Sequence, residues 1–210
     1  DKITFTIDPV DAKDHDDAVS IERMGDHWLL EVHIADVTHY VSEGGALDRE
    51  AYERSTSVYL VDRVIPMLPE RLSNDLCSLR PDVDRLTLSC VMQVSDSGEL
   101  TKYHFANGVI RSRAKLSYEM VMDYFVTGEK STTTAPLSST LDEMRRLARI
   151  FRARRFKLGS LDLDVPEAKV VLDAEGHPVE IRLRHSDESH QLIEEFMLVA
   201  NQCAAHIFLR

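Results

Sequence analysis

A dense run of aspartates between two short apolar stretches constrains this chain more than any other feature of its sequence. The run is Asp8, Asp11, Asp14, Asp16 and Asp17. Apolar residues alternate on both sides of it, with Ile3, Phe5 and Ile7 before it and Val19 and Ile21 after it. This pattern predicts two strands joined by an acidic loop. Carboxylates crowded on one loop repel one another, and a bound divalent cation is the simplest compensation.

Four of these acids are candidate metal ligands: Asp8, Asp14, Asp16 and Asp17. Asp14 and Asp16 project to the same side of an extended segment, and Asp17 projects to the other side unless the loop bends. Asp8 ends the incoming strand, where Pro9 fixes a turn. Hard cations such as Mg²⁺ take carboxylate, water and phosphate oxygens as ligands. The spacing therefore predicts two Mg²⁺ ions, with Mn²⁺ as an alternative, in the arrangement used for in-line displacement at phosphorus.

Two other acidic motifs do not fit this stretch. An EF-hand loop beginning at Asp14 needs an oxygen ligand at the position of Ala18 and a glycine at that of Val19. A phosphatase-type Asp-x-Asp directly after an apolar strand is absent, because Asp8 is followed by Pro-Val-Asp. A solvated acidic turn without a ligand remains the alternative.

Several longer segments carry a family resemblance. The acidic stretch TIDPVDAKDHDDA (6–18) is followed by HIADVTHYV (33–41), VIPMLPE (64–70), LSNDLCSL (72–79), GSLDL (159–163) and HQLIEEFMLVAN (190–201). In this order they resemble the ribonuclease II / ribonuclease R family, the RNB catalytic domain, and its ribonuclease R branch most closely. The likeness covers essentially the whole chain. It implies an α+β fold with a largely antiparallel mixed sheet flanked by helices.

The resemblance also implies an activity. We expect residues 1–210 to be the N-terminal portion of one RNB-like catalytic domain, incomplete at its C-terminus, with a transition-state arginine in the part that follows. Such enzymes hydrolyse single-stranded RNA from the 3′ end and release nucleoside 5′-monophosphates. Asp16 is then the most rate-critical acid, Asp14 a second catalytic one, and Tyr118 hydrogen-bonds a phosphate oxygen. A plain helix-surface tyrosine is the competing interpretation of Tyr118.

Further RNA contacts follow from the same resemblance. Tyr59 matches an aromatic that stacks on a base near the 3′ end, although a tyrosine packed in the core fits the sequence equally well. Glu194 matches a glutamate that touches the RNA end, and Glu195 is the alternative if the register is shifted by one. Leu163 stands where familiar bacterial relatives often carry a phenylalanine, so it offers an apolar contact without an aromatic face.

A basic helix is the one concentrated positive feature. A capping box, Thr140-Leu-Asp-Glu143, is expected to open it. Its apolar stripe is Leu141, Met144, Leu147 and Phe151, and its basic residues are Arg145, Arg146, Arg149, Arg152, Arg154, Arg155 and Lys157. Few acids are interleaved with them, so we expect RNA backbone contacts through Arg149 and Arg152, with a solvated helix face as the alternative.

Periodicity predicts the other elements. A hairpin is expected over 19–22 and 28–34, with Trp28, Leu30, Val32 and Ile34 on one buried face, and a second strand pair over 86–94 and 100–110. Helices are expected at 47–54, 70–79, 117–127 (closed by Gly128) and 190–210. Residues 131–139 are expected to form a mobile loop. For His33, Asp36 and His39 we expect hydrogen-bonded structural roles and not a zinc site.

Composition limits the class of protein. With 210 residues, 43% of them hydrophobic, the chain can build a core. The net charge of −11 lowers the RNA affinity expected of this piece. No apolar run approaches the ~20 residues of a membrane helix, and the start of the sequence has no secretory signal and no initiator Met. Cys77, Cys90 and Cys203 suit buried positions in a reducing cytoplasm.

We therefore expect a cytoplasmic, monomeric exoribonuclease whose full-length form adds cold-shock and S1 type RNA-binding domains. Its expected partner is single-stranded RNA and not a membrane. Two alternatives remain. One is a catalytically inactive RNA-binding module or fragment. The other is a different metal-dependent phosphoesterase that acts on small substrates.

Overall fold

A six-stranded sheet forms the centre of the computed structural model, which describes residues 2–161, 167–184 and 186–209. The strand order is β7-β6-β3-β2-β1-β8, and all neighbours are antiparallel except β1 and β8. The strands are β1 (Thr4–Asp8), β2 (Asp17–Met24), β3 (His27–Ala35), β6 (Asp84–Ser95), β7 (Leu100–Arg111) and β8 (Lys115–Ser117). The expected α+β fold with a largely antiparallel mixed sheet is therefore confirmed.

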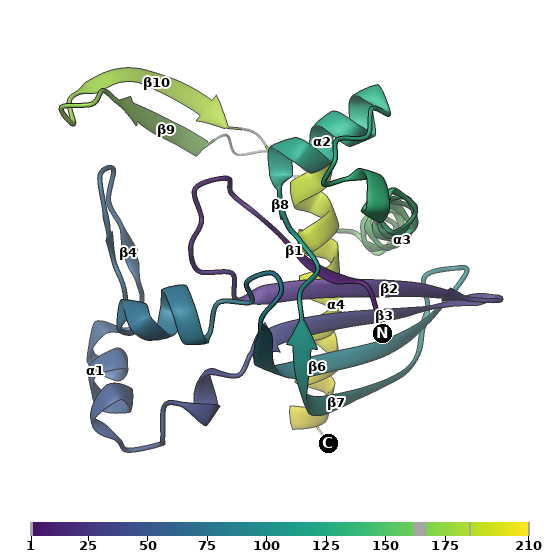
Figure 1. The fold of residues 1–210 in the computed structure, drawn as a ribbon. Helices are drawn as coiled ribbons and strands as arrows, with labels where there is room; N and C mark the ends of the chain where they lie inside the picture. The colour runs from purple at the N-terminus through teal and green to yellow at the C-terminus, as the bar shows by residue number, and fades with distance from the viewer. Residues whose placement is uncertain (1, 162–166, 185, 210) are drawn as a thin grey trace.

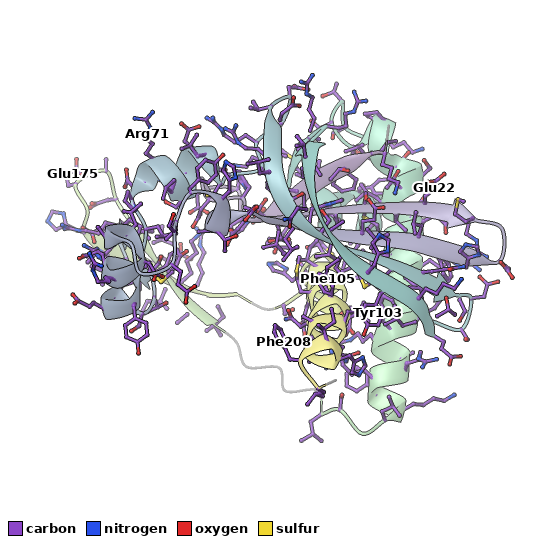
Figure 2. All side chains as sticks on the ribbon, turned by 90° about the horizontal axis from the view of Figure 1, so that it is seen from below. Glu22, Arg71, Tyr103, Phe105, Glu175 and Phe208 are labelled. Atoms are coloured by element: carbon purple, nitrogen blue, oxygen red, sulfur yellow. The ribbon has the colours of Figure 1, made fainter. Side chains whose placement is uncertain are left out.

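Three helices cover one face of this sheet (Figure 1). They are α2 (Tyr118–Thr127), α3 (Ser138–Lys157) and α4 (Glu188–Phe208). Trp28 from β3, Leu141 from α3 and Phe196 from α4 are fully buried in the core between sheet and helices. Figure 2 shows Tyr103 and Phe105 of β7 lying beside α4, and both pack against the same core. No helix in the described ranges is long and apolar enough to cross a membrane.

The other elements lie outside this sheet-and-helix core. α1 (Ala46–Arg54) and the short helical turns η1 (Val37–His39), η2 (Leu72–Leu76) and η3 (Ala135–Leu137) connect the larger elements. Two hairpins project from the sheet-and-helix core. One is formed by β4 (Val58–Tyr59) and β5 (Val64–Ile65), and the other by β9 (Glu167–Leu172) and β10 (Pro178–Arg184). Arg71, next to η2, and Glu175, at the tip of the second hairpin, lie on the same side of the molecule, away from Glu22 (Figure 2).

The β2–β3 hairpin forms as expected, with one exception on its buried face. Trp28, Leu30 and Val32 are fully buried against the helices. Ile34 is exposed, and so is Leu88, which lies opposite it on β6. At this end of β3 and β6, no helix of the described residues covers the sheet. The pattern of alternating apolar residues therefore extends past the part of the sheet that is buried.

The start of α3 differs from the expectation. The helix begins at Ser138 with Leu137 as its N-cap, so Thr140 lies inside the first turn and the predicted capping box is wrong. Glu143 instead accepts a hydrogen bond from Trp28 Nε1 at 2.7 Å. The preceding segment is also held in place, because Ser131 N donates to Thr134 Oγ1 at 2.9 Å and Thr134 is buried. Residues 131–139 are therefore not simply a loop, because they include η3 and the first residues of α3, and the mobility of this segment stays a prediction.

The other helices agree better with the sequence. α2 is capped by Ser117, whose hydroxyl accepts from Met120 N at 3.2 Å, and it ends at Gly128 with φ 72°. A left-handed backbone conformation at this position favours glycine, because the Cβ atom of any other residue would make that conformation strained. The predicted helix over 70–79 is reduced to η2, a single π-helical turn. All three cysteines are free and buried, as expected.

His33 and Asp36 take the structural roles expected of them. His33 is buried, with Nδ1 2.7 Å from Ser89 Oγ and Nε2 3.3 Å from Ser20 Oγ. Asp36 caps η1 by accepting from His39 N at 3.2 Å. Burial lowers the pKa of His33 to about 4, so the imidazole is neutral at pH 7.

Candidate active site

The acidic loop joins β1 to β2, with Asp8 closing the first strand and Asp17 opening the second. A turn at its start is closed by a hydrogen bond from Ala12 N to Pro9 O at 3.0 Å. Lys115 Nζ of β8 donates to Ala12 O at 2.7 Å, which fixes the same turn from the neighbouring strand. The loop is therefore anchored at its base and along one side.

The segment after η2 holds the rest of the loop. Ser78 Oγ donates to Lys13 O at 2.8 Å and accepts from His15 N at 3.2 Å. Leu79 N donates to His15 O at 2.7 Å. These bonds use backbone atoms of the loop, so they fix its path while its carboxylates remain available for other partners. The LSNDLCSL segment thus contributes to the site by supporting its backbone.

The acids differ in burial and in proton affinity. Asp8 is buried, and its Oδ2 lies 2.8 Å from Nδ1 of the buried His15. Burial, together with the charges of Asp8 and Asp16, raises the pKa of Asp17 to about 7. Asp16 reaches solvent, yet partial desolvation and the charges of Asp14 and Asp8 raise its pKa, against an opposing backbone hydrogen bond. Burial is therefore the main cause of both shifts, and neighbouring carboxylates add to it.

The chemistry of these carboxylates fits a hard divalent cation, although their side chains are not closed around one point. Among the described residues, no group of three or more acid, histidine or cysteine side chains is arranged as metal ligands. Asp17 nevertheless carries a pKa raised by burial and by two neighbouring acids. Such repulsion is relieved when a cation binds between carboxylates. Metal ligation by Asp8, Asp14, Asp16 and Asp17 stays a prediction.

Tyr59 lies against this loop. Its hydroxyl donates to Asp14 Oδ2 at 3.1 Å from the projecting β4–β5 hairpin. The side chain is not part of the core, since Tyr59 is 67% exposed, and the alternative of a core tyrosine is wrong. Partial burial and the neighbouring Asp14 raise the pKa of the Tyr59 phenol. A ring exposed beside the acidic loop is accessible to a stacked base.

Tyr118 approaches the loop from the other side. It is the first residue of α2, directly after Ser117, which is aligned with Asp8 in the parallel β1–β8 pair. Its ring stacks on His190 of α4, with centroids 4.0 Å apart and planes inclined by 13°. His190 Nδ1 lies 2.7 Å from Asp187 Oδ1. Tyr118 is therefore held by a neighbouring ring and is not a plain helix-surface tyrosine.

The two glutamates of α4 have different environments. Glu195 is 3% exposed and pairs with Arg155, whose Nη2 lies 2.6 Å from Glu195 Oε1. Glu194 lies one turn after His190 on the exposed side of the helix, 3.5 Å from the same guanidinium. Glu194 therefore remains the candidate for RNA contact. Leu163 lies outside the described residues.

The arginines of α3 have acidic partners that the sequence analysis did not identify. Arg149 Nη2 donates to Glu188 Oε2 at 3.1 Å, and Arg152 Nη1 lies 3.8 Å from Glu195 Oε1. The expectation of few acids beside these arginines is wrong, because α4 packs along α3 and supplies both glutamates. RNA contact by Arg149 and Arg152 stays a prediction.

Sequence reasoning missed several residues around the site. His15 and His190 lie inside the recognised segments, but nothing in their spacing indicates the contacts with Asp8 and Tyr118. Lys169 of β9 comes within 3.8 Å of Asp11 in the acidic loop. The contacts of Tyr118 with His190 and of Asp11 with Lys169 join segments that are distant in the sequence, and the contact of His15 with Asp8 depends on the path of the loop, so periodicity could not reveal them.

Comparisons with known proteins agree with this architecture. A family model described as RNB domain matches residues 1–210. Ribonuclease R 1 of Lactococcus lactis is 45% identical over 210 residues, covering 99% of this chain and 26% of that protein. Ribonuclease R of Thermotoga maritima is 46% identical over 210 residues, covering 99% and 30%. The chain thus spans about a quarter to a third of the length of these relatives.

The fold agrees with a solved structure as well. RNase R of Mycoplasma genitalium, in complex with ribose-methylated single-stranded RNA, superposes with a TM-score of 0.95 at 31% identity. The match covers 100% of this chain and 33% of that one. The sheet, the helices and the projecting hairpins therefore have a counterpart in a solved ribonuclease structure.

Proposed function

The chain belongs to the RNB domain family, and from that premise we propose that it supplies part of the active site of a 3′→5′ exoribonuclease. The reaction is hydrolysis of single-stranded RNA with release of nucleoside 5′-monophosphates. Relatives named ribonuclease R, at 45% and 46% identity over the full chain, support the reaction class. The enzyme acts as a cytoplasmic monomer, and its full-length form includes cold-shock and S1 type RNA-binding domains.

One observation carries the proposal: segments far apart in the sequence meet at the acidic loop. Tyr59 reaches Asp14 from a projecting hairpin, and Tyr118 begins a helix beside the end of β1. An exposed ring would stack a base, a phenol hydroxyl would orient a phosphate, and the carboxylates would hold the cations that offset the negative charge of that phosphate. Their meeting supports a nuclease site better than a solvated acidic turn.

The residues that would hold the metal are Asp8, Asp14, Asp16 and Asp17, with two Mg²⁺ ions, or Mn²⁺ in their place. When bound, these ions supply an activated water and neutralise charge on the phosphate and the leaving oxygen. The raised pKa of Asp17 supports this assignment, because burial and the charges of Asp8 and Asp16 disfavour its ionised form, and a bound cation would favour that form.

The side chains of the protein itself have separate tasks in this proposal. Asp16, the acid that reaches solvent, orients the attacking water by accepting its hydrogen bond. The water oxygen forms the new bond to phosphorus, and the bond to the 3′ oxygen of the preceding nucleotide breaks. Tyr118 donates a hydrogen bond to a phosphate oxygen, and Tyr59 stacks on a base.

The remaining predicted contacts bind the substrate. Glu194 touches the RNA end, and Leu163 gives a terminal base an apolar contact. Arg149 and Arg152 contribute to backbone binding through the surface shared by α3 and α4. Because both arginines also pair with glutamates, their contribution to RNA affinity is smaller than that of unpaired cations.

The test is a time course with a single-stranded RNA labelled at its 5′ end, incubated with Mg²⁺ and the full-length enzyme that contains this chain. Shortening one nucleotide at a time from the 3′ end, with 5′-mononucleotides released, supports the proposal. RNA that is bound but stays intact identifies an inactive binding module, which the open arrangement of the carboxylates also allows. Turnover of p-nitrophenyl phosphate without turnover of RNA identifies a phosphoesterase of small substrates.

A further inference from the structure

We infer that His190 is a positioning residue that holds the ring of Tyr118 in the orientation from which its hydroxyl reaches the phosphate. The inference rests on the proposed function, which places Tyr118 on the phosphate. Pairing of Ser117 with Asp8 fixes the backbone at the start of α2. This pairing does not by itself set the rotamer of the tyrosine ring, which also packs against the main core, so contacts of the ring are needed to place the hydroxyl.

His190 supplies that constraint through ring contact. The two rings are nearly parallel, inclined by 13°, with centroids 4.0 Å apart. At this separation the faces of the rings touch, so rotation of the tyrosine away from its orientation breaks the contact. Both residues are half-buried, which restricts the space into which the tyrosine ring could turn.

Asp187 in turn fixes the imidazole. It is the N-cap of α4, and its Oδ1 accepts from Ser189 N at 3.0 Å and lies 2.7 Å from His190 Nδ1. Burial acts to raise the pKa of Asp187, but hydrogen bonds from Ser189 and His190 outweigh it and the pKa is lowered. The carboxylate therefore stays ionised and holds the imidazole through Nδ1.

The helix that carries His190 is itself anchored. Phe196 is fully buried and meets Phe151 of α3 edge to face, with centroids 6.2 Å apart. Glu195 pairs with Arg155 of α3 at 2.6 Å. These contacts fix the rotation of α4 about its axis, so its first turn presents His190 to Tyr118. Asp187, His190 and Tyr118 thus form a continuous set of contacts from the N-cap of α4 to the first residue of α2, which follows the residue aligned with Asp8.

Three substitutions separate the ring stack of His190 on Tyr118 from its side-chain hydrogen bond to Asp187. His190→Ala removes both the ring stack and the hydrogen bond to Asp187. His190→Phe keeps a ring against Tyr118 without the hydrogen bond, and His190→Asn keeps a polar group for Asp187 without the ring. Asp187→Asn is added because asparagine still caps a helix while its amide replaces the carboxylate that holds the imidazole.

Steady-state kinetics on a single-stranded RNA oligonucleotide give the functional readout. Misplaced groups weaken transition-state contacts more than substrate binding, so we expect kcat to fall about 10- to 100-fold in His190→Ala and His190→Asn, with KM nearly unchanged. His190→Phe should recover most of kcat, and Asp187→Asn should give an intermediate loss. The matched control is His206→Ala, an exposed histidine near the other end of α4, which should keep wild-type kcat.

A structural readout separates this inference from the proposed function. NMR of tyrosine-labelled protein, with the Tyr118 signals assigned by Tyr118→Phe, should show ring shifts displaced by the neighbouring imidazole. The displacement should vanish in His190→Ala and persist in His190→Phe. Wild-type kcat in His190→Ala, or Tyr118 signals that do not move, overturns the inference. A full-length wild-type enzyme that degrades no RNA but shows the expected shifts refutes the proposed function and leaves the contact between the rings supported.

Discussion

The hydroxyl of Tyr59 donates to Asp14 Oδ2 at 3.1 Å, across 45 positions of the sequence. This bond links the projecting β4–β5 hairpin to the acidic loop, so that an exposed aromatic ring lies beside the carboxylates. The ring and the hydroxyl of Tyr59 can therefore be tested separately.

Replacing Tyr59 should separate stacking from hydrogen bonding. Base–aromatic stacking contributes about 1–3 kcal/mol per base, so Tyr59→Ala should weaken binding of single-stranded RNA about 5- to 150-fold. Tyr59→Phe keeps the ring and should stay close to wild-type affinity. Fluorescence anisotropy with a labelled oligonucleotide, in EDTA to prevent hydrolysis, measures both. Equal losses in the two variants would contradict a stacking role.

The ion pair between Glu195 and Arg155 should be important for stability. Arg155→Ala leaves the carboxylate of Glu195 buried, with Arg152 at 3.8 Å. Breaking a buried ion pair costs about 3–5 kcal/mol of the free energy of unfolding. Because Arg152 remains beside Glu195, we expect the loss in Arg155→Ala to lie near the lower end of this range. Urea unfolding measures the loss. Arg149→Ala, which removes a largely exposed guanidinium, should cost less than about 1 kcal/mol; a loss as large as that of Arg155→Ala would refute the distinction.

Stability should fall as the pH decreases below about 6.5, the ordinary pKa of an unfolded histidine. The pKa of His33 is lowered to about 4 by burial, so between these two values the unfolded state binds more protons than the folded state. The contribution of His33 to the free energy of unfolding is complete above pH 6.5. It is lost as the pH falls from 6.5 to 4, at up to about 1.4 kcal/mol per pH unit.

Urea unfolding at several pH values tests this slope. The wild-type curve minus that of His33→Gln isolates the contribution of His33 from that of the carboxylates. His39→Gln, which replaces an exposed histidine, is the control and should leave the slope unchanged. A difference curve that is flat between pH 4 and 6.5 would show that His33 is not buried in its neutral form.

Mg²⁺ should stabilise the folded chain if the carboxylates bind it. A ligand at about 100 times its Kd adds about 2.7 kcal/mol to the free energy of unfolding. We expect a concentration-dependent rise in Tm for wild type and for Asp11→Asn, because the Asp11 side chain is mostly exposed and is not a predicted ligand. Asp8→Asn should lose most of the rise. Equal shifts in all three proteins would indicate nonspecific ion effects.

The local parts of the fold could be predicted from the sequence because they depend on neighbouring residues. Alternating apolar residues give β2, β3, β6 and β7, and Ser117 and Gly128 mark the ends of α2. The acidic loop was predicted from the density of its aspartates and from the apolar stretches beside it. Its chemistry could be inferred in the same way, since crowded carboxylates need compensation wherever they lie.

The rest depends on contacts between distant elements. Glu143 was assigned to a helix cap, yet it accepts from Trp28, because the approach of α3 to the sheet brings them together. Arg149 was expected to lack acidic partners, yet α4 supplies Glu188. The stack of Tyr118 on His190 likewise requires α2 and α4 to meet. None of these pairs has a spacing in the sequence that indicates contact.

The most direct test of the account compares two substitutions within the acidic loop. Asp16→Asn removes the acid proposed to orient the attacking water, and Asp11→Asn removes an exposed acid of the same loop. Groups that support a metal site contribute about 10- to 100-fold to activity, and a direct participant should contribute more, so hydrolysis by Asp16→Asn should fall by at least about 100-fold. RNA affinity should stay nearly intact, because stacking and backbone contacts lie elsewhere.

The decisive measurement is therefore the rate of 5′-mononucleotide release, together with RNA affinity, for the full-length enzyme as wild type, Asp11→Asn and Asp16→Asn in Mg²⁺. The account predicts that Asp16→Asn alone loses hydrolysis while all three bind RNA alike. Hydrolysis by Asp16→Asn at the wild-type rate, or a loss of affinity that parallels the loss of activity, would contradict it.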